Sequence, residues 1–322
     1  MRRREFIIAF AGAAILPNLS RAQQPGRVRH IAILLFSQQD RGVIEPCLRE
    51  LQALGYVDGK TVAIEYRDAE GNYERLPELA AELVRLNPDV IFSFGGEQAP
   101  IVKGATASIP IVVVVSNDPV ASGLVASLAR PGGNVTGVTY VHDQLAGKTI
   151  ELLKEAAPWV SRVAILWNPN HADAEFRETQ RAAPVLKVQL QSLEVRESGD
   201  FEGAFQAATR KRAEAVIVVG SRILSLHRKQ IGDFAAKNGV VLVGTPKWLL
   251  EAGALLTYGP NAAELNRRAA IYVDKILRGA KPADLPMQQP ATFELTINLK
   301  AARTLGLTVP PSLLARADEV IE

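Results

Sequence analysis

The chain has 322 residues, of which 48% are hydrophobic and 6% aromatic, and its formal net charge is +3. This length allows two domains with large cores, and the composition is typical of a folded α/β protein and argues against disorder. Four arginines and one glutamate within residues 1–22 account for the whole net charge. Because the remainder is neutral and has no basic cluster, the sequence argues against a nucleic-acid or anionic-membrane partner.

Residues 1–22 read MRRREFIIAFAGAAILPNLSRA, a cationic start followed by an apolar run and then by small residues at Ser20 and Ala22. This order is typical of a removable export signal. The apolar run, residues 6–16, is shorter than the roughly 20 residues that span a bilayer, so we expect no stable membrane insertion. The motif RREFI, which begins at Arg3, resembles a twin-arginine signal, and a general secretory signal is the alternative.

Cys47 is the single cysteine of the sequence, so an intramolecular disulfide cannot form. No cysteine lies near the end of the signal, where a lipid is usually attached, and we expect the mature protein to begin near Gln23 and to be free in its compartment. Cys47 stands at helical spacing with Ile44, Leu48 and Leu51, which predicts a buried core position rather than a nucleophile.

Strand-like runs alternate with helix-like runs along the mature chain, and the series occurs twice in the same order. VRHIAILLF, from Val28, corresponds to VSRVAILW, from Val160, and LPELAAELVRL, from Leu76, corresponds to FEGAFQAATRK, from Phe201. Strands that alternate with helices form parallel sheets with helices on both faces. We therefore expect an α/β fold of two similar doubly wound parallel-sheet lobes joined by a hinge.

The predicted lobe boundaries follow from these two copies. Residues 27–140 form the N-terminal lobe, and residues 141–281, the second copy with the helix-like segment after it, form the C-terminal lobe. The connector GAKPADLP, which begins at Gly279, leads into the tail, residues 282–322. This tail corresponds to no segment of the two repeated series, and we expect it to return to the N-terminal lobe. The predicted crossings between the lobes lie near residues 141, 260 and 282.

The two lobes predict a single binding site. A ligand of an open parallel sheet binds beyond the carboxyl ends of the strands, and two such sheets that face each other place those ends around one cleft. Polar, glycine and aromatic residues at these positions suit a small polar solute, from which closure of the lobes excludes water. The candidate ligand-binding residues are Ser37, Gly95, Gly96, Gln98, Ser116, Asn117, Asp118, Tyr140, Asn168, Asn170, Ser221, Arg222, Trp248 and Tyr258.

Several candidates also have a purely structural explanation. Asp118 precedes a proline as a helix cap would, and Asn117 can stabilise the turn before it. Arg222 can hold a carboxylate or lie on the surface beside a helix start. As ligand groups, Asp118 would meet an ammonium, and Trp248 and Tyr258 would contact a planar side chain. The residues therefore suggest an amino acid or similar solute, aromatic or branched.

The sequence lacks the motifs of common catalysts. No G-x-G-x-x-G follows a strand, Gly95-Gly96 lacks the lysine and hydroxyl of a P-loop, and no G-x-S-x-G elbow is present. None of the four histidines has a second histidine or cysteine at the spacing of metal ligands. We expect no catalytic residue, cofactor or metal. The alternative is an enzyme on a flavodoxin-like scaffold that uses Asp118 and a cleft histidine.

Three segments together carry a resemblance to a known family. They are ALGYVDGKTVAIEYRDAEGNYERLPELAAELVRLNPDVIFSFGG, PIVVVVSNDPVASGLVASLARPGGNVTGVT and LGLTVPPSLLARADEVIE. With them the chain resembles, over essentially its whole mature length, the bacterial ABC transporter substrate-binding proteins of the type I periplasmic-binding fold. The resemblance is to the family that includes tryptophan-binding lipoproteins.

The resemblance implies a two-lobed protein that delivers a small solute to an ABC permease in the inner membrane and catalyses no reaction. Anchored members carry a cysteine at the end of the signal, whereas this sequence has Ala22-Gln23, which implies a soluble, periplasmic form. We expect a monomer. A ligand-sensing domain for a membrane receptor is a further alternative. No helix-turn-helix precedes Val28, which argues against a transcription regulator.

Overall fold

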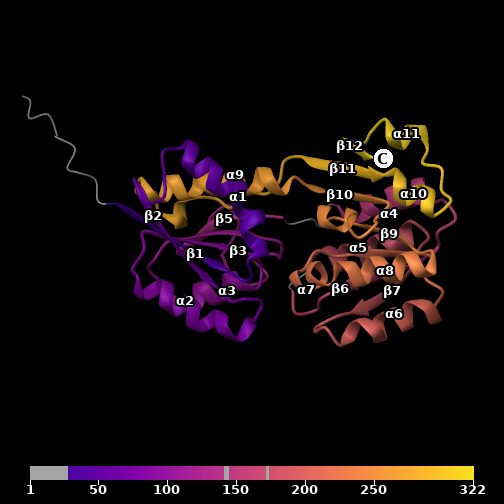
Figure 1. Cartoon of the computed structure of the whole chain (residues 1–322), viewed down its shortest axis with the longest axis horizontal. Coiled ribbons are helices and arrows are strands. Elements are labelled where there is room, and N and C mark those ends of the chain that lie inside the picture. The colour runs from indigo at the N-terminus through magenta and orange to yellow at the C-terminus, as the bar shows by residue number, and fades with distance from the viewer. Residues whose placement is uncertain (1–27, 141–144, 172–173) are drawn as a thin grey trace, which may run out of the picture.

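The computed structural model describes residues 28–140, 145–171 and 174–322. These residues form two α/β lobes, which lie side by side in Figure 1. The predicted export signal lies outside the described residues. Within the described ranges, no helix combines the length and the apolar character that a membrane span requires.

The first lobe contains, in the described residues, a five-stranded parallel sheet in the order β2-β1-β3-β4-β5. Its strands are β1 (Arg29–Leu35), β2 (Val62–Asp68), β3 (Val90–Phe94), β4 (Ile111–Val115) and β5 (Val135–Thr139). The central strands are continuous apolar runs because both faces of the sheet are buried, as Ile33 and Leu34 in β1 illustrate on opposite sides. One face is covered by α1 (Gln39–Ala53) and α9 (Ala262–Leu277), and the other by α2 (Leu76–Arg85) and α3 (Gln98–Ala105).

The second lobe repeats this topology. The order β7-β6-β8-β9-β10 corresponds strand by strand to β2-β1-β3-β4-β5, which confirms the predicted duplication and the doubly wound fold. β11 continues the sheet antiparallel to β10, and β12 lies beyond it. The strands are β6 (Arg162–Trp167), β7 (Gln189–Glu194), β8 (Ala215–Val218), β9 (Val241–Gly244), β10 (Leu256–Pro260), β11 (Phe293–Asn298) and β12 (Glu319–Ile321).

Helices cover both faces of the second sheet as well. The core on one face includes residues from α4 (Ala146–Ala156), α5 (Ala174–Val185), α10 (Leu299–Thr304) and α11 (Pro311–Leu314). The core on the other includes residues from α6 (Asp200–Arg210), α7 (Arg222–Leu226) and α8 (Arg228–Asn238). Short 3₁₀ helices are η1 (Tyr73–Arg75), η2 (Lys247–Leu250) and η3 (Pro282–Asp284).

The predicted lobe assignment is wrong for α9, which was expected in the second lobe, and for β11 and β12, which were expected in the first. α9 packs against α1 and the first sheet, whereas β11 and β12 extend the second sheet (Figure 1). Residues 285–288 do run along the first lobe, where Gln288 exchanges backbone hydrogen bonds with Gly137 and Thr139. A chain that begins in one lobe and crosses three times must end in the other. The tail therefore completes the edge of the second sheet, where Leu295 and Ile297 add to the core.

Two local predictions about packing are confirmed. Leu76, Leu79 and Leu83 of α2 form one buried stripe against the sheet. Cys47, on the buried face of α1, is 1% exposed, and burial raises the pKa of its thiol to about 12. The thiol therefore stays protonated at neutral pH, in keeping with a packing role.

Candidate functional site

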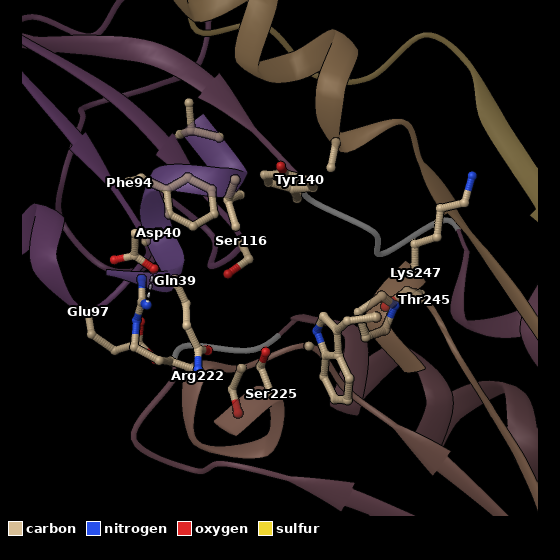
Figure 2. A pocket seen from close by; sticks show the side chains of 18 of the residues that line it. Gln39, Asp40, Phe94, Glu97, Ser116, Tyr140, Arg222, Ser225, Thr245 and Lys247 are labelled. Atoms are coloured by element: carbon tan, nitrogen blue, oxygen red, sulfur yellow. Dashed lines mark hydrogen bonds and ion pairs between the residues drawn. The ribbon is translucent and has the colours of Figure 1, made fainter. Parts of the chain in front are cut away.

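A cavity of about 330 Å³ lies between the two lobes, beyond the carboxyl ends of strands from both sheets. Figure 2 shows side chains that project into it from either side. Among its lining residues, the first lobe contributes Gln39, Asp40, Phe94, Glu97, Ser116 and Tyr140. Those of the second lobe include Glu175, Ser221, Arg222, Ser225, Thr245, Lys247 and Trp248. The cavity lies where the carboxyl-end argument places it.

Some of the predicted ligand-binding residues line this cavity, and others do not. Six of them do: Gly95, Ser116, Tyr140, Ser221, Arg222 and Trp248. Each stands directly after a strand or in the first turn after one, which is the position on which the prediction rested. Their contact with a solute stays a prediction.

Three predicted residues, Gly96, Asn117 and Asp118, follow lining residues in the sequence but do not line the cavity, and their polar groups form hydrogen bonds within the protein. The Asn117 side chain donates a hydrogen bond to the Gly96 carbonyl at 3.3 Å, which ties the loop after β4 to the loop after β3. Asp118 accepts hydrogen bonds from the backbone N–H groups of Val120 at 2.9 Å and Ala121 at 3.0 Å. For Asp118 the geometry thus favours the capping alternative, with a turn rather than a helix as the capped element.

Five further predicted residues, Ser37, Gln98, Asn168, Asn170 and Tyr258, lie outside the lining. Gln98 is fully buried at the start of α3, and Tyr258 packs against the core of the second lobe. Asn168 accepts a hydrogen bond from the backbone N–H of Asn170 at 2.9 Å and so closes the turn after β6. Position after a strand identifies the correct edge of a sheet, but the direction of each side chain depends on the turn that follows.

The other lining residues were not among the predicted candidates, and Asp40, Phe94 and Glu175 are three of them. Asp40 lies in the first turn of α1 and is 3% exposed. Its position three residues after Ser37, at the start of a helix that follows a strand, is a sequence signal for a capping carboxylate. Glu175 lies in α5 and is 4% exposed, and it accepts a hydrogen bond from the Thr245 hydroxyl at 3.3 Å. No sequence motif marks Glu175.

The aromatic and charged groups of the lining differ in their environment. Burial raises the pKa of Tyr140, so that its phenol is neutral at physiological pH, and the Asn266 amide donates to its oxygen at 3.5 Å. Lys247 is exposed and forms an ion pair with Glu319 at 2.6 Å, and this hydrogen-bonded pairing raises the pKa of the lysine. The Tyr140 phenol therefore stays uncharged within the site, whereas Lys247 is exposed and already paired with a carboxylate.

The lobes contact each other at the side of the cavity. Arg222 of the second lobe donates to Asp40 of the first, with 2.5 Å between Nη1 and Oδ1. Ser116 Oγ of the first lobe and His171 Nε2 of the second lie within hydrogen-bond distance at 3.0 Å. In the described residues, no group of three or more histidine, cysteine or acidic side chains is arranged to hold a metal ion.

Two duplicated parallel-sheet lobes around a cleft define a type I periplasmic binding protein-like fold. The chain belongs to the ABC transporter substrate binding protein family, whose model matches residues 37–321. A relative from Clostridioides difficile named tyrosine-binding protein is 24% identical over 263 residues, which cover 81% of this chain and 75% of the relative.

Solved structures share the fold. A domain from Streptococcus pneumonia in complex with L-Trp has a TM-score of 0.85 at 23% identity and covers 92% of this chain and 100% of its own. A conserved domain protein from Vibrio cholerae has a TM-score of 0.86 at 28% identity and covers 91% and 100%. A ligand-free, open substrate-binding protein from Clostridium difficile has a TM-score of 0.69 at 22% identity and covers 91% and 99%.

Proposed function

We propose that this protein captures one aromatic amino acid in the periplasm and delivers it unchanged to an ABC permease. The observation that carries the proposal is the interlobe cavity lined by the rings of Phe94, Tyr140 and Trp248 together with serine and threonine hydroxyls. Rings supply flat apolar area for a planar side chain, and hydroxyls supply hydrogen bonds to a polar head group. A branched apolar amino acid is the alternative solute.

The size of the cavity supports a single amino acid rather than a peptide. Its volume of about 330 Å³ is at the lower end of the range of roughly 300–1,000 Å³ typical of small-molecule pockets. The names of two related proteins point the same way, since one is a tyrosine-binding protein and another is solved in complex with L-Trp.

The charge of the lining supports a solute that carries an ammonium group. Among the described residues, three carboxylates and two cations line the cavity, and both cations are already paired, Arg222 with Asp40 and Lys247 with Glu319. Glu97 has one carboxylate oxygen, Oε1, that is buried and has no hydrogen-bond partner among the described residues. A buried carboxylate oxygen is costly unless it is paired. We therefore assign to Glu97, rather than to Asp118, the role of binding the ammonium group of the solute.

We place the protein in the periplasm as a monomer without catalytic activity. The export signal expected at residues 1–22 supports this location. The contact between Ser116 and His171 has the distance of a nucleophile and its base, and it is the observation that would favour an enzyme. It also joins two different lobes, as a closure contact does. Recovery of the solute after incubation distinguishes the two roles.

The test is a thermal-shift and calorimetry screen of the mature protein. L-tyrosine, L-tryptophan and L-phenylalanine are compared with L-leucine, L-lysine and benzoate, and the released solute is analysed by mass spectrometry. A solute at 100 times its Kd adds about 2.7 kcal/mol to the stability. We expect stabilisation by at least one aromatic amino acid, which is recovered unchanged. Binding of benzoate but of no amino acid, or a change in the mass of the solute, would contradict the proposal.

A further inference from the structure

We propose that Arg222 is a positioning residue that fixes the second lobe onto a socket in the first lobe, and that it does not bind the carboxylate of the solute. Arg222 begins α7, but its guanidinium lies in the first lobe beside Asp40 (Figure 2). The two side chains are only 10% and 4% exposed. The guanidinium carbon lies 4.9 Å from the centre of the Phe36 ring and 5.9 Å from that of Phe94.

The socket is held in shape by the first lobe itself. The second carboxylate oxygen of Asp40, Oδ2, accepts a hydrogen bond from the backbone N–H of Phe36 at 2.8 Å, which fixes the acceptor at the end of β1. Gly95 also borders the socket, close to the guanidinium. A Cβ atom at Gly95 would lie 3.0 Å from Arg222 Nη2, and its φ of 112° is one that other residues rarely adopt. Glycine at this position therefore makes room for the arginine of the other lobe.

The adjacent glycine plays the same part for a second interlobe contact. A Cβ atom at Gly96 would lie 2.9 Å from His171 Nε2, the atom that lies 3.0 Å from the Ser116 hydroxyl. The Gly95-Gly96 pair thus admits one side chain of the second lobe at each residue. Both contacts lie beside the cavity, where the lobes meet around the solute.

The pairing decides what Arg222 can do for binding. Its charge is already matched by a buried carboxylate, so it attracts a solute carboxylate less than an unpaired arginine would, even though its Nε has no hydrogen-bond partner among the described residues. Removal of either partner leaves the other charge buried and uncompensated while the lobes touch, and opening returns that charge to water. The pair therefore stabilises the arrangement in which the lobes meet, and its loss weakens every solute by the same factor.

The experiment uses Asp40→Asn, Arg222→Gln and the double variant in the full-length mature protein. Each is titrated with L-tyrosine and with L-tyrosinamide, which lacks the carboxylate. We expect each single variant to bind both probes roughly tenfold or more weakly, and the double variant to be no weaker than the worse single. If Arg222→Gln weakens L-tyrosine but not L-tyrosinamide while Asp40→Asn leaves both unchanged, Arg222 holds the carboxylate and the inference is wrong.

The titration rests on the proposed function, because it assumes that an aromatic amino acid binds. A second measurement does not rest on it. Small-angle scattering of the solute-free proteins is expected to give a larger radius of gyration for both single variants than for the wild type. Gly95→Ala is expected to behave like them, whereas Gly123→Ala, with φ of 70° and no atom within 4 Å of its added Cβ, controls for backbone strain. Equal radii in folded wild type and variants would overturn the inference, even if no aromatic amino acid binds.

Discussion

Trp248→Ala gives the sharpest test of the aromatic site. Trp248 lies in η2 and lines the cavity, while the next two residues, Leu249 and Leu250, anchor η2 in the core. A solute ring stacked on the indole would bury about 80 Å² of apolar surface, worth about 2 kcal/mol at 25 cal/mol per Å². Some of this contact survives through the other rings, so we expect a loss of at least about 1.4 kcal/mol, which is a tenfold increase in Kd.

Calorimetry with L-tyrosine measures this loss of affinity, and tryptophan fluorescence shows which tryptophan contacts the solute. Trp159 is 52% exposed and is not a lining residue, which makes Trp159→Ala the matched control. Trp167 is stacked on Phe176, with 3.8 Å between the ring centres, and is also absent from the lining. The fluorescence change on binding should persist in Trp159→Ala and disappear in Trp248→Ala. If Trp248→Ala binds L-tyrosine as tightly as the wild type, the indole is a packing residue and the aromatic argument fails.

Further expected outcomes concern closure, packing and acid stability. Saturation with the solute should lower the radius of gyration in small-angle scattering, and an unchanged radius would indicate a rigid site. Gly137→Ala should prevent folding or lower the Tm strongly, because its φ is 141° and an added Cβ would lie 2.1 Å from the Val113 carbonyl oxygen. Burial raises the pKa of Glu214, but hydrogen bonds from Ser161 and Arg162 outweigh it and lower the pKa overall. The stability from Glu214 is therefore present above its unfolded pKa of about 4.3 and is lost as the pH falls through the lower folded value. Denaturant unfolding at several acidic pH values should show that the free energy of unfolding depends less on pH in Glu214→Gln than in the wild type.

The repeat made the fold predictable. Two copies of the same strand and helix series specify the same sheet order in each lobe, and the apolar stripe of α2 specifies which face is buried. The destination of α9 and β11 was not predictable in the same way, since neither has a counterpart in the other copy. An amphipathic helix fits either sheet equally well, and a short strand fits either open edge. The packing of α9 on α1 and the pairing of β11 with β10 are long-range contacts without a local signal.

The candidate site was predictable only for those residues whose position depends on one lobe alone. Residues such as Ser116 and Ser221 line the cavity because a strand end aims the chain at it, whereas Asn117 and Asp118, one and two residues further on, serve the turn. The pairing of Asp40 with Arg222 joins residues 182 positions apart and exists only once the two lobes meet. From sequence, Arg222 was a cation that suited a carboxylate. It does meet one, but the carboxylate belongs to the protein, so the charge that suggested a ligand contact instead fixes how the lobes meet.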